Sequence, residues 1–241
     1  MENALATTCA EGLTFFSKTN RLISHELKNI LAIISETLGL MEELTALAKS
    51  GKDLAPGKLE SLSTSIIEEV ERANQLTRGM NTFAHTVDEL TSEVDVRQAV
   101  ESIMQLARLD ADIKNTGVRL APGDACRAHT SAFFLQNLIY RILKQAPAGE
   151  DRPAGAGPIE IAIAEGDDAV QIIFSNTMMR TASPFPTERQ AFLAEMLSAH
   201  INKDKSANKD KSADVLTITL PKKPGDSMID RIVSSLADNL Q

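Results

Sequence analysis

The first third of the chain carries one helical pattern that runs without a proline from about residue 10 to residue 49. Apolar side chains recur along it at alternating spacings of three and four, which is the heptad pattern of helices that pack side by side. A helix of this length with one apolar face needs another helix to cover that face. The residues of this stripe are Ile23, Leu27, Ile30, Ile34, Thr37, Met41, Leu44 and Ala48.

A turn and a second helical pattern follow. Gly51, Pro56 and Gly57 predict a turn over residues 50–57, and a second apolar stripe predicts a helix over about residues 58–90. Because two such helices cannot bury both apolar faces alone, we expect an antiparallel hairpin that forms a homodimer, a four-helix bundle. The second stripe consists of Leu59, Leu62, Ile66, Val70, Ala73, Leu76, Met80, Phe83, Val87 and Leu90.

From Glu93 onward the pattern changes to a mixture of helices and strands. We expect an α+β protein of two domains, with the helical hairpin in residues 1–92 and an α/β sandwich in residues 93–241. Two copies of the polar sequence Asn-Lys-Asp-Lys-Ser-Ala predict a loop over residues 202–213. Helices are predicted at 97–115, 132–146 and 227–240, and strands at 94–96, 117–120, 159–164, 169–174 and 215–221, the last of which closes the sheet.

Composition and charge narrow the classes of partner. A net charge of -8 without a concentrated basic patch predicts binding to neither nucleic acid nor an anionic membrane. Cys9 and Cys126 are typical of a reducing compartment, and no apolar run approaches the roughly 20 residues that span a membrane, so we expect a cytoplasmic protein. His85, His129 and His200 share no metal-ligand spacing, so neither a metal nor another cofactor is expected.

One histidine of the first helix has neighbours that point to chemistry. His25 is followed by Glu26 and, one helical turn later, by Asn29. At about 100° per residue, Ile23 and Leu27 lie nearly opposite His25, which predicts its imidazole on the solvent face. Free imidazole, with an ordinary pKa of about 6.5, is largely neutral near pH 7 and keeps a nucleophilic ring nitrogen. An isolated surface histidine is usually only polar, but here an acid, a base and an amide follow it together.

The residues around His25 have expected roles. Glu26 is expected to hold the proton of the second ring nitrogen, and Asn29 to position a water or an incoming acidic partner. The same helix face is expected to form a docking surface for the partner. The small side chain of Ala32 leaves room there for the partner to approach. The docking residues are Arg21, Lys28, Ala32 and Glu36.

This part of the sequence resembles the phosphoacceptor box of bacterial two-component histidine kinases. Many of those kinases carry proline where this chain has Ile30. This difference removes a helix kink but no residue with a chemical role. The order of elements after residue 93 is similar to the ATP-binding (Bergerat-type) domain of the same kinases. The string that carries the first resemblance is Ser24-His25-Glu26-Leu27-Lys28-Asn29-Ile30-Leu31-Ala32-Ile33.

The residues that hold nucleotide in that family are replaced in this chain. Arg141 and Gln145 stand where the family has two magnesium-side asparagines, and Asn176 stands where it has an adenine-reading aspartate. Met178 and Arg180 replace glycines of the family, and no glycine occurs from residue 167 to residue 224. The second glycine-rich phosphate loop is therefore missing, and binding of ATP is not expected.

An intact phosphoacceptor box beside a degenerate nucleotide site resembles the dimeric histidine phosphotransferases of the ChpT type. The resemblance implies that His25 accepts a phosphoryl group from the aspartate of one response-regulator receiver domain and passes it to another. Three alternatives remain open. They are a divergent histidine kinase, which the missing glycines oppose, a receiver phosphatase in which Glu26 and Asn29 orient water, and a non-catalytic dimeric scaffold.

Overall fold

The computed structural model describes residues 2–52, 55, 57–147, 152, 157–177, 184–205, 214–223 and 227–232. The chain divides into two compact units, of which Phe16–Asn81 forms the smaller, the hairpin unit. Met1–Phe15 and Thr82–Gln241 form the larger unit. Two long helices, α1 (Glu2–Lys49) and α2 (Lys58–His85), contribute to both units.

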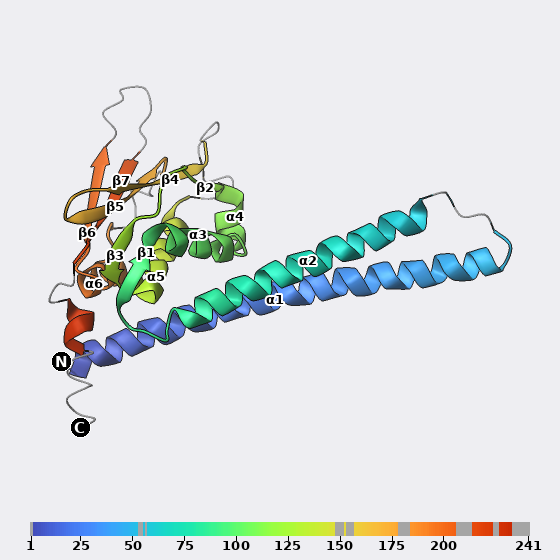
Figure 1. Ribbon diagram of the computed structural model, residues 1–241, viewed down its shortest axis with the longest axis horizontal. Helices are drawn as coiled ribbons and strands as arrows, with labels where there is room; N and C mark the ends of the chain where they lie inside the picture. The colour runs from blue at the N-terminus through green and yellow to red at the C-terminus, as the bar shows by residue number, and fades with distance from the viewer. Residues whose placement is uncertain are drawn as a thin grey trace. The chain divides into compact units, whose positions relative to one another are not determined.

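Within the hairpin unit, α1 and α2 run antiparallel (Figure 1). Ile23 and Ile30 of the first stripe are buried, whereas other large apolar side chains of the same unit are exposed. Leu31 is 60% exposed and Ile67 is 56% exposed. The pairing of α1 with α2 therefore leaves part of the apolar surface of this unit uncovered. The prediction that two hairpins form a four-helix bundle stays a prediction.

The second helix ends at His85, earlier than the predicted residue 90. The backbone N–H groups of Thr86, Val87 and Asp88 each donate to a carbonyl three residues earlier, and the Thr86 hydroxyl donates to the Phe83 carbonyl at 2.6 Å. These tighter bonds satisfy the last carbonyls of the helix and end it. The apolar residues Val87 and Leu90 continue the sequence pattern but are exposed.

The larger unit is built on a mixed five-stranded sheet with the strand order β2–β4–β5–β7–β6. Its only parallel pair among the described strands joins β2 to β4, and the other three pairs are antiparallel. A separate antiparallel pair joins β1 (Ser92–Asp95) to β3 (Arg127–Thr130). The sheet strands are β2 (Val118–Leu120), β4 (Ile159–Glu165), β5 (Ala169–Ser175), β6 (His200–Lys205) and β7 (Asp214–Pro221).

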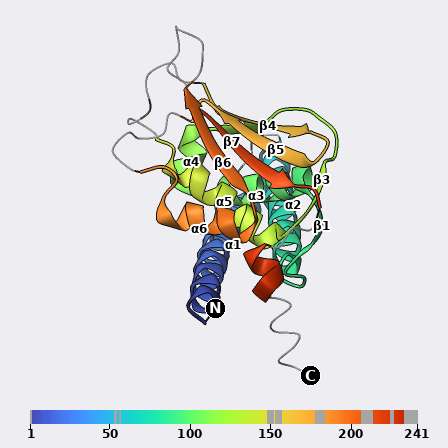
Figure 2. The ribbon, with the colours of Figure 1, turned by 90° about the vertical axis from the view of Figure 1, so that its left-hand side faces the viewer.

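Figure 2 shows the helices of this unit gathered on one side of the sheet. They are α3 (Val96–Ala107), α4 (Ala111–Thr116), α5 (Ala132–Gln145) and α6 (Glu188–Met196). Strand residues alternate accordingly between a buried face and a more exposed one. The α+β class with a helical hairpin and a mixed-sheet α/β part is therefore confirmed. The buried strand residues are Ile159, Ile161, Val170, Ile172, Phe174, Leu216, Ile218 and Leu220.

Inside the larger unit, aromatic rings join the first part of α1 and the last turn of α2 to α5. The ring centroid of Phe15 lies 5.5 Å from that of Phe83, 5.3 Å from that of Phe133 and 5.8 Å from that of Tyr140. Phe15 comes from the start of α1 and Phe83 from the end of α2, and both side chains are buried. The chain segments that enter and leave the hairpin are thus part of the core of the larger unit.

Three predictions of secondary structure need correction. The helix predicted over 97–115 is two helices, because the N–H groups of Leu109 and Asp110 donate to carbonyls three residues earlier in turns that interrupt it. The strand β3 was not predicted. The loop predicted over 202–213 is wrong for residues 202–205, which belong to β6, and residues 206–213 lie outside the described residues. A polar sequence suffices for β6 because it lies at the sheet edge, and β7 consequently lies inside the sheet.

The remaining predictions of this kind lie partly outside the described residues. The C-terminal helix predicted over 227–240 is described only to residue 232, and residues 228–232 are helical. Met178 and Arg180 also lie outside the described residues. No described helix is both long enough and apolar enough to pass through a membrane.

Candidate functional site

His25 lies on the exposed face of α1, within the hairpin unit. Ile23 and Ile30, two residues before it and five after it, are buried. The heptad pattern thus orients this part of the helix, since burial of the apolar stripe turns the opposite side toward solvent. An exposed imidazole on a regular helix is sterically open to a macromolecular partner.

A chain of polar contacts links His25 to the second helix of the hairpin. The Asn29 side-chain nitrogen Nδ2 lies 3.3 Å from His25 Nδ1 and 3.5 Å from Glu26 Oε2. The other carboxylate oxygen, Glu26 Oε1, accepts a hydrogen bond from Arg72 Nη2 on α2. Arg72 Nη1 in turn lies 3.3 Å from Glu69 Oε2. We call these five side chains the His25 network.

The structure places Glu26 differently from the sequence prediction. Glu26 was expected to hold the second ring nitrogen of His25, but its oxygens face Arg72 and Asn29. Adjacent residues of a helix point in directions about 100° apart, whereas residues three or four positions apart lie on one side. Asn29 is therefore the residue that reaches the imidazole. Within the described part of the chain, His25 Nε2 has no hydrogen-bond partner.

The predicted docking residues all lie at the surface of α1. Arg21, Lys28, Ala32 and Glu36 are exposed. The three charged side chains among them make no hydrogen bond or ion pair with another described residue. They are therefore available to a partner that approaches His25.

Arg72 and Glu69 were not predicted as site residues, although both take part in the His25 network. The spacing of three residues between them is a visible signal of an ion pair on one helix. Which residue of α1 faces Arg72 depends on how the two helices are offset along one another. Figure 1 shows α1 extending past the start of α2, an offset that the turn sequence does not specify.

The positions where the resemblance places nucleotide ligands are occupied by internal contacts of the larger unit. Arg141 Nη2 lies 2.5 Å from Oε2 of the buried Glu11, and Arg189 Nε lies 3.2 Å from Glu11 Oε1. Gln145 accepts a hydrogen bond from Gln190 Nε2 at 3.0 Å and donates to the carbonyl of Pro184 at 3.4 Å. We call these contacts, together with those that Tyr140 and Lys144 make with Asp110, the Glu11 network.

The residues of this region do not fit a magnesium–nucleotide complex. A guanidinium at Arg141 cannot ligate a cation, and the amide of Gln145 already has partners at both ends. Asn176 donates from its side-chain Nδ2 to the backbone carbonyl of Pro158 at 3.3 Å. The backbone carbonyl of Asn176 accepts a hydrogen bond from Arg152 Nη2 at 3.0 Å. Each of these three residues thus holds the protein's own structure together.

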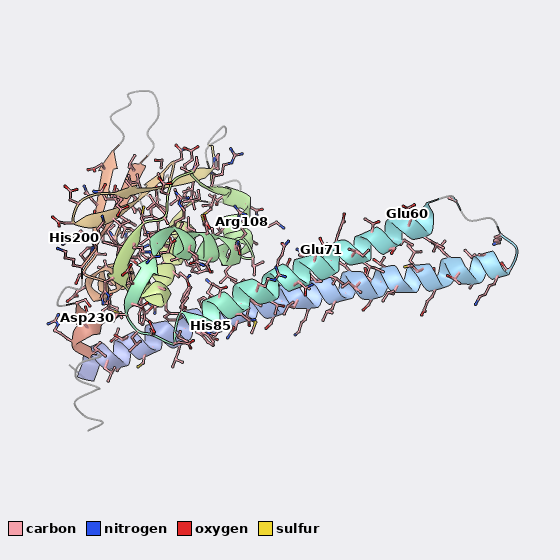
Figure 3. The ribbon with its side chains drawn as sticks, viewed as in Figure 1. Glu60, Glu71, His85, Arg108, His200 and Asp230 are labelled. Carbon is pink, nitrogen blue, oxygen red and sulfur yellow. The ribbon has the colours of Figure 1, made fainter. Side chains whose placement is uncertain are left out.

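The other three histidines lie apart from one another in sequence, and two of them are labelled in Figure 3. Figure 3 shows His85 at the end of α2 and His200 at the start of β6. His85 Nδ1 lies 2.8 Å from Asp88 Oδ2. Among the residues that the structure describes, no group of three or more His, Cys, Asp or Glu side chains is arranged to hold a metal ion.

Solved structures similar to the chain include two histidine kinases and an ATP-binding domain. Histidine kinase AdeS of Acinetobacter baumannii is 12% identical, with a TM-score of 0.41, over 83% of this chain and 98% of that one. The ATP-binding domain of PrrB from Mycobacterium tuberculosis is 16% identical, with a TM-score of 0.44, over 56% of this chain and 100% of that one. The mycobacterial sensor histidine kinase MprB is 12% identical, with a TM-score of 0.41, over 56% of this chain and 100% of that one.

No protein-family model and no curated protein sequence matches the chain. The assignment of a function therefore depends on the residues of the chain itself.

Proposed function

We propose that this chain is a histidine phosphotransferase of a two-component phosphorelay, of the ChpT type. His25 accepts a phosphoryl group from a receiver aspartate and passes it to another receiver, without binding ATP. The observation that carries the proposal is the exposed imidazole of His25, whose Nδ1 contacts Asn29 while Nε2 has no hydrogen-bond partner among the described residues. The internal contacts of Arg141 and Gln145 support the absence of a nucleotide-dependent step.

The transfer step needs no group beyond the two reacting side chains and the receiver's own site. A lone pair on a neutral ring nitrogen of His25 attacks the phosphorus of the aspartyl phosphate, forming a nitrogen–phosphorus bond. The oxygen–phosphorus bond to the aspartate breaks, and its electron pair leaves on the receiver carboxylate. Phosphoryl transfer depends mainly on in-line positioning and charge stabilisation, so an accessible and correctly oriented imidazole suffices on this side.

The exposed apolar side chains of the hairpin unit support the homodimer. Leu31, Leu38, Ile67 and Val70 are all more than 40% exposed. Large apolar side chains left exposed on a helical hairpin are typical of protein interfaces, and a second hairpin offers a matching apolar surface. The charged surface of Arg21, Lys28 and Glu36 beside His25 remains for a receiver domain.

The test is transfer of radiolabelled phosphate from phosphorylated receiver domains to the purified full chain in the presence of Mg²⁺. We expect acid-labile label on the wild-type chain and a loss of at least about 100-fold in His25→Ala, because the nucleophile is removed. His85→Ala is the matched control, since it removes another exposed helical histidine and should leave labelling unchanged.

Other results would overturn the proposal in distinguishable ways. Label acquired from ATP alone would identify a kinase. Receivers that lose label faster with the chain than without it, while no label appears on the chain, would identify a phosphatase. If, across a broad set of receiver domains, the receivers keep their label and the chain acquires none, the protein is a scaffold.

A further inference from the structure

The contacts of the His25 network fix the orientation of the Asn29 amide. A carboxylate oxygen only accepts hydrogen bonds, so Glu26 Oε2 at 3.5 Å selects the NH₂ end of the amide. The same nitrogen faces His25 Nδ1 at 3.3 Å. An amide NH₂ group donates and cannot accept. The contact with Asn29 therefore stabilises the imidazole tautomer with a lone pair on Nδ1 and its proton on Nε2.

This tautomer places the proton on the ring nitrogen that faces solvent. In a neutral imidazole only the unprotonated nitrogen has a lone pair for attack on phosphorus. Attack through Nε2 therefore requires the proton to leave Nε2 for solvent and another to bind Nδ1, where an acceptor must be present. A half-turn of the Asn29 amide presents its oxygen to Nδ1, but it also turns the NH₂ group away from Glu26.

The side chain that holds Glu26 in place comes from the other helix. Arg72 Nη2 donates to Glu26 Oε1, and Arg72 is itself held by Glu69 one turn earlier on α2. The Arg72 side chain is 48% exposed, so an anionic partner can reach it. A phosphoryl group is a strong ligand for a guanidinium because it accepts paired, charge-assisted hydrogen bonds.

We propose that Arg72 is a positioning residue that, through Glu26 and Asn29, selects the tautomer of His25. At rest, Arg72 holds the ring in the Nε2–H form. A phosphorylated receiver that draws the guanidinium away from Glu26 frees the amide to turn and the ring to carry its proton on Nδ1, leaving Nε2 nucleophilic. The consequence for transfer rests on the proposed function, whereas the control of the tautomer does not.

The test is nitrogen-15 NMR of the histidine side chains in the full-length protein, at a pH well above the ordinary imidazole pKa. His25→Ala assigns the His25 signals. We expect the Nε2–H form to predominate in the wild type, and the ratio of Nε2–H to Nδ1–H to fall about two- to fivefold in Arg72→Ala, the range of an exposed ion pair. Arg72→Lys should retain most of the wild-type ratio because an ammonium also pairs with Glu26.

Arg78→Ala is the matched control, since Arg78 is an exposed arginine of α2 that forms no ion pair with another described residue. A predominantly Nδ1–H wild type, or the same ratio in Arg72→Ala and Arg78→Ala, would overturn the proposal.

In the phosphate-transfer assay, Arg72→Ala should accept label about two- to fivefold faster, and an equal or slower rate would refute the effect on transfer. Because the NMR measurement needs no receiver, failure of the proposed function leaves it interpretable.

Discussion

The His25 network and the Glu11 network use the same kinds of side chain but differ in burial. In the hairpin unit, the Glu26 side chain is 18% exposed and pairs with Arg72, which is 48% exposed. In the larger unit, the Glu11 side chain is 9% exposed and pairs with Arg141 and Arg189. Exposed ion pairs contribute about 0–1 kcal/mol and exchange readily with a partner. Breaking a buried pair by removing one side chain costs about 3–5 kcal/mol.

This difference shows that residue type alone does not separate a reactive site from a structural one. Both networks contain an arginine, a carboxylate and a side-chain amide. The two networks differ most clearly at their central carboxylate and its inner arginine: Arg72 beside Glu26 is 48% exposed, whereas Glu11 is buried and Arg141 beside it is 22% exposed. The buried network instead occupies the region where a nucleotide site was conceivable and makes it part of the core.

The largest effect is expected from Glu11→Ala. This change leaves Arg141 and Arg189 without their shared carboxylate, and Arg141 is only 22% exposed. We expect the free energy of unfolding to fall by about 2–4 kcal/mol, measured by urea denaturation followed by circular dichroism. Glu36→Ala, an exposed carboxylate of the same helix, should change it by less than about 0.5 kcal/mol. Equal effects of the two changes would remove the distinction drawn between the networks.

A smaller loss is expected from Tyr140→Phe. The Tyr140 hydroxyl donates to Asp110 Oδ2 at 2.6 Å in a buried position, while Lys144 Nζ contacts Asp110 Oδ1 at 2.7 Å. Removal of the hydroxyl deletes one charge-assisted hydrogen bond but leaves the lysine in place. The same denaturation experiment should show a decrease of about 1–2 kcal/mol. An unchanged free energy of unfolding would mean that water replaces the hydrogen bond between Tyr140 and Asp110 without loss of stability.

The smallest effect on stability is expected from Asn29→Ala in the exposed network. Asn29 is exposed in the middle of a helix, where alanine has the higher helix propensity. We expect the free energy of unfolding to stay constant or to rise by up to about 0.5 kcal/mol, whereas the NMR tautomer ratio of His25 should change. A loss of stability above about 1 kcal/mol would mean that the His25 network is structural.

Much of the fold follows from patterns within short stretches of sequence. The heptad stripe predicts the buried Ile23 and Ile30, and period-two alternation predicts β4 and β5. The strand β6 escaped prediction because an edge strand needs only backbone hydrogen bonds to its neighbour and tolerates a polar sequence. Local pattern thus identifies elements that bury side chains and misses those held mainly by backbone pairing.

The sequence predicts only those contacts of the candidate site that lie within one helix. Its exposed residues follow from helical geometry on α1, and so does the reach of Asn29 to His25. The contact between Glu26 and Arg72 joins residues 46 positions apart and depends on the offset between two helices. No local pattern encodes that offset, because it is set by how the apolar side chains of both helices interlock.

The edge position of β6 has a consequence for self-association. A free sheet edge can pair with a strand of another molecule and lead to aggregation. Asn202, Lys203 and Asp204 are exposed along this edge, and their hydration and charge oppose such pairing. This edge of the sheet is thereby protected against pairing with a strand of another molecule.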